Sequence, residues 1–334
     1  MFSYISVRAL PRASLLPVCR ISKATVRPFR LVLQSVMVLL CGVAGAAAWA
    51  QAPGAASASS SSAEAAVVQP VEISFALHAN GAAVQCGKPL AATGMPAVPA
   101  TLRDARFYVQ EVALVDQKGQ LTPVKLAPSD WQNDQVTLID FEDASGACAG
   151  GTPATNIVVK GSVPAGQYTG LAFTVGVPVA QNHTSTELEG APLDLASMGW
   201  SWQAGRKFIK LEVNPEGGVT KADGSRSSTW FVHLGSTGCT GNPVTGETVS
   251  CMRPNRLPVV LQSFDPARNT VVLDLAALLS TSDIAHDNVG AVGCMSNPAD
   301  KECIAIFERL GLSLETGVSL KSGVSPVFSA GMKP

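Results

Sequence analysis

The sequence predicts an all-β domain, an antiparallel β-sandwich or barrel-like fold with long loops. Short segments rich in Val, Ile, Phe and Thr recur over residues 71–275, and Gly, Pro, Asn and Asp bound them. Helix signals are nearly absent over the same range, and six cysteines follow residue 50. Residues 71–334 are numerous enough to bury a core of their own, so we expect one disulfide-stapled domain there.

Each strand is expected where apolar and β-branched residues gather over a few positions. The expected strands are residues 71–79, 106–116, 135–141, 156–163, 168–177, 207–213, 229–234, 257–264 and 269–275. One short helix is expected near the C-terminus. Asn297 is its predicted N-cap, Pro298 its first helical position, and Gly311 the residue after its end. Ile304 and Phe307 would share its buried face.

The first 50 residues have the pattern of a signal peptide. Six Arg and Lys precede the apolar run 31–48, no acid occurs, and Ala-Trp-Ala ends at Ala50. A membrane anchor is the competing interpretation, but the run is short and leads directly into small and polar residues. Residues 51–70 form an Ala/Ser-rich linker. We therefore expect an exported bacterial protein, periplasmic and not inserted in the membrane after cleavage.

Cleavage would change the charge balance. Removal of the six cations leaves 18 Lys and Arg against 25 Asp and Glu, a net charge of −7. This sign argues against nucleic acid or anionic lipid as a partner. It suits a soluble protein that meets a basic partner or a metal ion.

The cysteine count favours disulfides, because an even number in an oxidising compartment is typical of them. Six cysteines allow 15 pairings. Pairing of near neighbours predicts Cys239–Cys251 and Cys294–Cys303, which leaves Cys86–Cys148. A thiolate metal site is the alternative, but no C-x-x-C occurs. The sequence alone leaves the connectivity open.

Two of the four histidines have contexts that suit metal ligands. His183 lies in the polar loop "GVPVAQNHTSTELEG", and His233 ends the strand "TWFVHL" before a Gly-rich loop. Loops and strand ends held by a rigid sheet are where β-proteins place ligands, although an ordinary surface histidine is the alternative for each. His286 is expected to be a solvated loop residue. His78, in the first strand, is either a third ligand or an outward polar position.

Half of the tryptophans after residue 50 lie in "MGWSWQAGRKFIKLE", residues 198–212. Trp200 and Trp202 alternate as strand residues do and would share a face, and Gly205 limits how far that face extends. An aromatic patch that closes one end of the sandwich is the alternative to a functional pair.

Other chemical motifs are weak. Asp140, Glu142 and Asp143 could suggest a glycosidase pair or a calcium loop, but a solvated turn is the simpler interpretation. No G-x-S-x-G, H-E-x-x-H or P-loop occurs. Paired cysteines also argue against a blue-copper site.

Several stretches together resemble one family. They are "DARFYVQEVALVD", "VTLIDFED", "TGLAFTVGVP" followed by "NH", "MGWSWQAGRKFIKLE", "HLGSTGC" and "CMRPNR". In the same order these resemble the MbnP-like periplasmic copper-binding proteins, the four-Cys member of the metallo-mystery pair. The likeness runs from about Phe75 to Phe307. One departure is visible, since Arg206 stands where the family has an aromatic residue after Gly205.

The resemblance implies a modified tryptophan. In this family a di-haem protein of the MauG/cytochrome c peroxidase type oxidises the first Trp of W-x-W to kynurenine, which with histidines binds one copper ion. Carried over, Trp200 becomes kynurenine, and His183 and His233 become the imidazole ligands of copper, expected as Cu(I). Opening of the indole supplies an aryl amine and a ketone as donors. Trp202 would be a packing wall or electron relay, and Met198 a soft neighbour.

We therefore expect a periplasmic copper-binding protein for copper homeostasis or delivery, and not an enzyme. Two alternatives remain. One is a secreted β-sandwich that binds or hydrolyses carbohydrate with Asp140 and Glu142. The other is a structural surface protein whose tryptophans are core residues.

Overall fold

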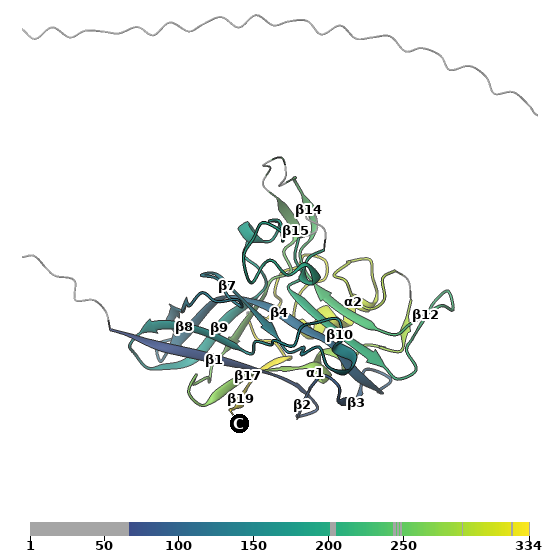
Figure 1. Cartoon of the computed structure of the whole chain (residues 1–334), viewed down its shortest axis with the longest axis horizontal. Coiled ribbons are helices and arrows are strands. Elements are labelled where there is room, and N and C mark those ends of the chain that lie inside the picture. Colours follow the sequence, from purple (N-terminus) through teal and green to yellow (C-terminus); the bar gives the residue numbers. More distant parts are fainter. Residues whose placement is uncertain are drawn as a thin grey trace, which may run out of the picture. The chain divides into compact units, whose positions relative to one another are not determined.

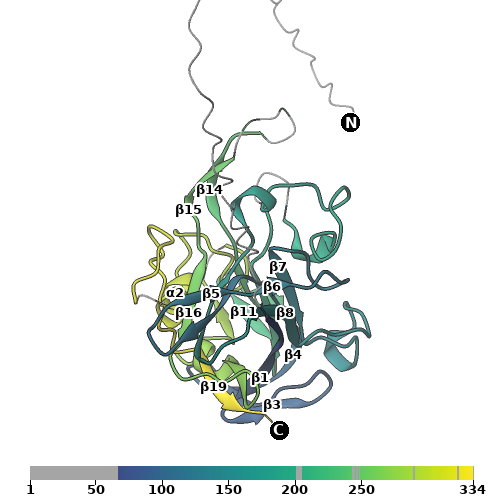
Figure 2. The ribbon, with the colours of Figure 1, turned by 90° about the vertical axis from the view of Figure 1, so that its left-hand side faces the viewer.

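A computed structural model describes residues 67–200, 205–242, 245, 247, 249–288, 290–321 and 323–333. The expected signal peptide, the linker up to residue 66 and Trp202 lie outside these residues. Most of the described elements are strands, in two large sheets and two small ladders. Figure 1 shows them from the face, and Figure 2 after a quarter turn.

The first sheet has the order β19-β17-β1-β8-β6, with β2 beside β1. Its strands are β1 (Val68–Ala79), β2 (Ala82–Ala83), β6 (Lys125–Leu126), β8 (Val158–Pro164), β17 (Asn269–Asp274) and β19 (Phe328–Met332). Its pairs are antiparallel except β1 with β17. In β1 the alternate residues from Val71 to Ala79 are buried, as expected for a strand with one face on the core.

The second sheet has the order β13-β10-β4-β9-β16, and β3, β5 and β7 also pair with β4. Its strands are β3 (Pro89–Thr93), β4 (Val98–Asp116), β5 (Leu121–Pro123), β7 (Val136–Asp140), β9 (Tyr168–Val175), β10 (Ile209–Pro215), β13 (Trp230–Leu234) and β16 (Leu257–Leu261). Glu111, at φ 54°, lies where the pairing of β4 with β9 shifts register. Such a bulge bends a strand, which lets β4 serve several partners.

Phenylalanines from both sheets meet between them and define a sandwich. The ring of Phe75 on β1 lies 5.9 Å from that of Phe107 on β4 and 5.7 Å from that of Phe173 on β9. Phe328 on β19 contacts the same two rings edge-on. All four side chains are buried. The predicted fold class is therefore confirmed.

The remaining elements are short. They are the ladder of β11 (Val219–Lys221), β12 (Arg226–Ser227) and β18 (His286–Asp287), the hairpin of β14 (Thr237–Thr240) and β15 (Ser250–Arg253), α1 (Leu275–Leu279), α2 (Glu302–Leu310), and the 3-10 turns Gly146–Cys148, Val179–Gln181 and Ala196–Met198. In both views the β14–β15 hairpin stands out from the sheets (Figures 1 and 2). No helix in the described part of the chain is long and apolar enough to cross a membrane.

Three disulfides join the described cysteines in the pairs expected from near-neighbour pairing. They are Cys86–Cys148, Cys239–Cys251 and Cys294–Cys303. The first and third are buried, whereas Cys239 and Cys251 are partly exposed and lie opposite each other on the two strands of the projecting hairpin.

The C-terminal helix ends as predicted but begins later than Asn297 and Pro298. Gly311 closes α2 in the left-handed conformation, at φ 73°. Asn297 instead forms a separate turn, in which its side chain accepts from the backbone N–H of Ala299. The predicted face is also wrong for Ile304, which is half exposed, while Phe307 is buried. A strong N-cap residue followed by proline starts a turn here because its side chain satisfies the next backbone groups locally.

Candidate metal centre

Three segments meet where β10 begins and β13 ends: the loop after β9, the turn around Trp200, and residues 234–236. The amide oxygen of Asn182 accepts from the backbone N–H of Arg206 at 3.0 Å. The N–H of Trp200 bonds to the carbonyl of Gly205 at 3.0 Å, and that of Phe208 to the carbonyl of Leu234 at 2.6 Å. Long-range hydrogen bonds therefore hold the three segments together.

Trp200 lies in this turn and not in a strand, which corrects its expected strand position. The shared face of Trp200 and Trp202 stays a prediction. A bridge between Gly199 and Arg206 closes the turn, and Trp202 falls outside the described residues. The indole packs directly on Gly235, where an added Cβ would lie 2.4 Å from its Cζ3 atom. The half-buried Trp200 thus lies against Gly235, which follows His233 by two residues in the chain.

The amide of Asn182 sets which nitrogen of His183 carries a proton. Since Oδ1 of Asn182 accepts from Arg206, its Nδ2 faces the Nε2 of His183, at 3.0 Å. An NH₂ group only donates, so Nε2 acts as the acceptor, and the lone pair that a metal would use lies on Nε2. Gly205, at φ 82°, makes the approach possible, because a Cβ there would lie 2.8 Å from Asn182 Nδ2.

The same nitrogen of His183 faces the hairpin disulfide. Sγ of Cys251 lies 3.4 Å from Nε2 of the 93% buried His183. The ligand atoms of His183, Cys239 and Cys251 all lie within 4.8 Å of one another, close enough to hold one metal ion. The two sulfurs are bonded to each other, however, and a disulfide is a far weaker donor than two thiolates.

His233 is prepared differently. Its Nε2 lies 2.9 Å from a carboxylate oxygen of Glu212 on the neighbouring strand. Burial acts to raise the pKa of Glu212, but the hydrogen bonds from His233 and Lys210 prevail and lower it to about 2, so Glu212 is ionised. Burial lowers the pKa of His233. The neutral imidazole therefore donates from Nε2, and its lone pair lies on Nδ1.

Nδ1 of His233 is buried and has no hydrogen-bond partner among the described residues. A buried polar atom without a partner is costly, by about 1–3 kcal/mol. The arrangement of a carboxylate, a histidine and a bare ring nitrogen is the one that metalloproteins use to orient imidazole ligands. His233 thus fits a metal ligand by its own geometry.

Charged residues surround Glu212 in the sheet. Lys210 bonds to Glu212 and Asp104, and Asp104 also accepts from Arg106. Lys207, whose pKa burial lowers to about 8, donates to the carbonyls of Ser197 and Gly199 just before Trp200. This network ties the Trp200 turn to the strand that carries Glu212.

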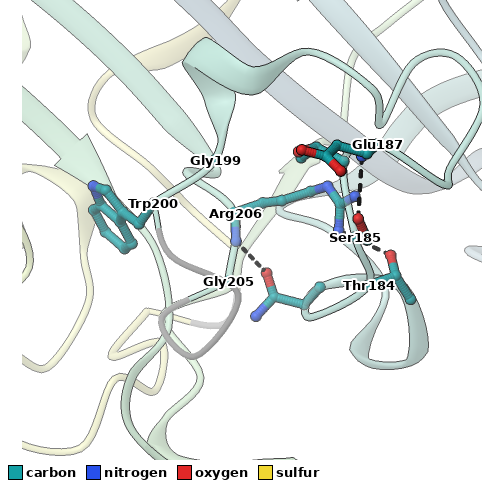
Figure 3. A pocket seen from close by; sticks show the side chains of 9 residues that line it. Thr184, Ser185, Glu187, Gly199, Trp200, Gly205 and Arg206 are labelled. Carbon is teal, nitrogen blue, oxygen red and sulfur yellow. Dashed lines mark hydrogen bonds between the residues drawn. The ribbon is translucent and has the colours of Figure 1, made fainter. Parts of the chain in front are cut away.

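A half-open cavity of about 390 Å³ lies beside Trp200, lined by Asn182, Thr184, Ser185, Thr186, Glu187, Gly199, Trp200, Gly205 and Arg206. In Figure 3 the side chain of Arg206 extends toward Thr184 and Ser185, whereas the indole points away from them. Arg206 is buried and donates to the carbonyl oxygens of Gln181 and Leu193 and to the hydroxyl of Thr184. Arg206 thereby fixes the loop that carries His183.

Three other predicted residues have other surroundings. Met198 is fully buried in a core cluster with Tyr108 and Phe208, which makes it a packing residue. His78 is half buried on β1, in register with Asp274 of β17. His286 is exposed, as predicted, and bonds to Asp283 at 2.9 Å. The three-residue ligand group at the hairpin includes His183 but not His233, so the prediction that both bind one ion stays a prediction.

The acidic residues after β7 do not form the expected solvated turn. Asp143 is exposed, but Asp140 and Glu142 are buried, and Glu142 pairs with Arg106 at 3.5 Å. Burial raises the pKa of Asp140 to about 7. Gly151 packs directly on the carboxylate of Glu142. Neither acid lines the cavity beside Trp200.

Sequence reasoning missed Asn182, Glu212 and Gly235. Asn182 precedes His183 and entered the sequence analysis only as part of the stretch "NH", with no role of its own. Glu212 ends the stretch 198–212 and follows Leu211 in the strand, so the two side chains lie on opposite faces of the sheet. The sequence does not tell which residue Glu212 contacts on its face. Gly235 packs against Trp200, and Gly205 packs against Asn182. Nothing else in the sequence marks these two glycines as contact points.

Comparison with known proteins covers most of the described chain. The family model of MbnP matches residues 68–296. The chain is similar to the solved structure of MbnP from Methylosinus trichosporium, with 47% sequence identity and a TM-score of 0.76. That match covers 80% of this chain and 100% of the other. No curated protein sequence matches.

Proposed function

The chain belongs to the MbnP family, and on that premise we propose that it is a periplasmic copper-binding protein of copper homeostasis. In this proposal it is not an enzyme, and it acquires its full ligand set only after a di-haem MauG/cytochrome c peroxidase-like partner oxidises Trp200 to kynurenine. The export pattern of residues 1–50 supports the location.

The observation that carries the proposal is the bare Nδ1 of His233. It is buried, lacks a partner among the described residues, and belongs to a ring that ionised Glu212 orients through Nε2. His183 offers Nε2, with its tautomer fixed by Asn182. Two neutral imidazoles form a donor set that copper accepts, including the cuprous ion.

The surroundings of Trp200 support its role as the modified residue. Trp200 is half buried and borders the cavity, and its ring packs on Gly235, two residues beyond His233. Indole offers no lone pair to a metal, whereas kynurenine carries an aryl amine and a ketone on the same backbone position. Oxidation at this position would therefore add a donor beside the end of β13.

Histidine variants test the ligand assignment. His183→Ala and His233→Ala, each in the partner-treated protein, are expected to remove most of the copper found by metal analysis, with the circular-dichroism spectrum unchanged. His286→Ala is the control, because His286 is exposed and already bonds to Asp283. A full equivalent of copper in both site variants would show that the assignment is wrong.

Tryptophan variants test the modification. Peptide mass spectrometry of protein co-expressed with the di-haem partner is expected to find, at Trp200, one carbon lost and one oxygen gained. Trp200→Phe should abolish this change and copper binding, whereas Trp202→Phe should leave the modification in place. A modified Trp202, or full copper binding by unmodified protein, would contradict the proposal.

A further inference from the structure

Of the three disulfides in the described residues, Cys239–Cys251 has a surrounding that the other two lack. Its Cys251 sulfur lies 3.4 Å from Nε2 of His183, and the three donor atoms lie within 4.8 Å of one another. In the Cys86–Cys148 bridge the sulfurs instead lie near backbone carbonyl oxygens, that of Phe141 for Cys86 and that of Leu102 for Cys148. Among the described residues, the hairpin bridge is therefore the one that brings two sulfurs close to an imidazole nitrogen.

Exposure also separates this bridge from the others. Cys239 and Cys251 are partly exposed and form a directly opposed pair on β14 and β15, the hairpin that projects from the sheets (Figures 1 and 2). Cys86, Cys148, Cys294 and Cys303 are all at most 6% exposed. Thiol–disulfide exchange requires direct attack on a sulfur, so a soluble reductant reaches the hairpin bridge first.

We propose that reduction of Cys239–Cys251 creates a thiolate site, in which both sulfurs and Nε2 of His183 bind one cuprous ion. A dithiol reductant supplies two electrons and two protons. The S–S bond breaks, two thiols form, and the dithiol becomes a disulfide. Binding of the ion then releases the two thiol protons to water. Thiolates are soft ligands and suit Cu(I).

The present spacing is close to that of such a site. A nitrogen at about 2.0 Å and a sulfur at about 2.3 Å from one ion lie roughly 3.5 Å apart at tetrahedral angles. The 3.4 Å between Nε2 and Cys251 Sγ is nearly that distance. The sulfur of Cys239, within 4.8 Å of Nε2, must move away from that of Cys251 once the bond between them is broken. They lie on directly paired residues of β14 and β15, so side-chain rotation can separate them without moving the backbone pairing.

This inference deepens the proposed function and rests on it in one respect, since His183 would serve both sites. In the oxidised chain, His183 would exchange the contact of its Nε2 with Asn182 for copper at the site of His233 and Trp200. In the reduced chain it is drawn to the thiolates. Reduction would thus move copper from one ligand set to the other and couple its release to the redox state of the hairpin.

The test uses full-length exported protein carrying Trp200→Phe, which lacks the proposed kynurenine donor. A limited amount of dithiothreitol is applied without oxygen and removed, and alkylation with mass spectrometry verifies that Cys239 and Cys251 alone are free. Cu(I) is then supplied in competition with bathocuproine disulfonate. We expect one Cu(I) bound per reduced chain, with ultraviolet thiolate-to-copper absorption, and none in the oxidised chain.

Matched variants locate the site. The double variant Cys239→Ser/Cys251→Ser should lose the reduction-dependent copper, and His183→Ala should weaken it about tenfold or more. If the double variant does not fold, reduced chain alkylated at both cysteines replaces it, and it should bind no Cu(I). A reduced chain with both thiols free that binds no more Cu(I) than the oxidised chain would overturn the inference.

The outcomes separate the two proposals. If the oxidised, partner-treated wild type binds copper and the reduced Trp200→Phe chain does not, the thiolate site is wrong and the proposed function stands. If the reduced chain binds Cu(I) and the oxidised, partner-treated wild type does not, the thiolate site stands and the proposed function is wrong.

Discussion

Gly235→Ala adds a single methyl group at the point where the Trp200 indole rests on β13. The new Cβ would lie 2.4 Å from Cζ3 and 2.8 Å from Cη2 of the indole, and 2.9 Å from the carbonyl oxygen of Arg206. Ordinary contacts begin near 3.4 Å, so the ring must retreat by about 1 Å or leave the site. Overpacking of this kind costs about 1–3 kcal/mol.

The expected result is a loss of about 1–3 kcal/mol in the free energy of unfolding, measured with urea, together with weakened copper binding and changed tryptophan fluorescence. Gly235 does not need a left-handed backbone, so the effect would report the close contacts with the Trp200 indole and the Arg206 carbonyl and not a strained φ. The change in tryptophan fluorescence reports the Trp200 contact.

Gly190→Ala is the matched control, because Gly190 also has an ordinary φ and nothing lies within 4 Å of its added Cβ. It should leave both measurements unchanged. If Gly235→Ala left stability and copper binding at wild-type values, the packing of the indole on β13 would play no part in the site.

Two further predictions follow from buried carboxylates. The pKa of Asp140 is raised from 3.8 to about 7, so its stabilising contribution is complete at low pH and is lost as pH rises toward 7. Wild-type protein should therefore lose roughly 2 kcal/mol of unfolding free energy between pH 5 and pH 7 that Asp140→Asn does not lose, as measured by urea titration at each pH. The same pH dependence of the unfolding free energy in both proteins would contradict a buried, protonated Asp140. Glu212→Gln should weaken copper binding about 10–100-fold in competition titrations, because the ring of His233 loses its ionised partner. Wild-type affinity in that variant would exclude Glu212 from the site.

The sequence located the strands that carry the site but not the contacts between them. Segments 207–213 and 229–234 correspond closely to β10 and β13, because β-branched and aromatic residues mark strands locally. The partner of His233 depends on register, which pairs Lys210 with His233 and leaves Glu212 diagonally opposite. Register is a property of two segments, and one strand's pattern does not contain it.

Contacts between distant segments also explain why the surroundings of the Asp140–Glu142 segment and of Trp200 were predicted wrongly. Asp140 and Glu142 looked solvated because their cationic neighbour, Arg106, lies on another strand. Trp200 looked like a strand residue because W-x-W alternates, yet the bonds that shape its turn come from Asn182 and Gly205. Tertiary hydrogen bonds override local propensity at both places.

The pairing of His233 with Glu212 also bears on how acidity would affect metal uptake. Metal binding usually releases protons, because ligands must first lose them, and affinity then falls in acid. Here the His233 ring is already neutral. Its proton is on Nε2, in the hydrogen bond to Glu212, and Nδ1 carries none. An ion that bound at Nδ1 would displace no proton from this residue, so its binding there would be insensitive to small changes in pH.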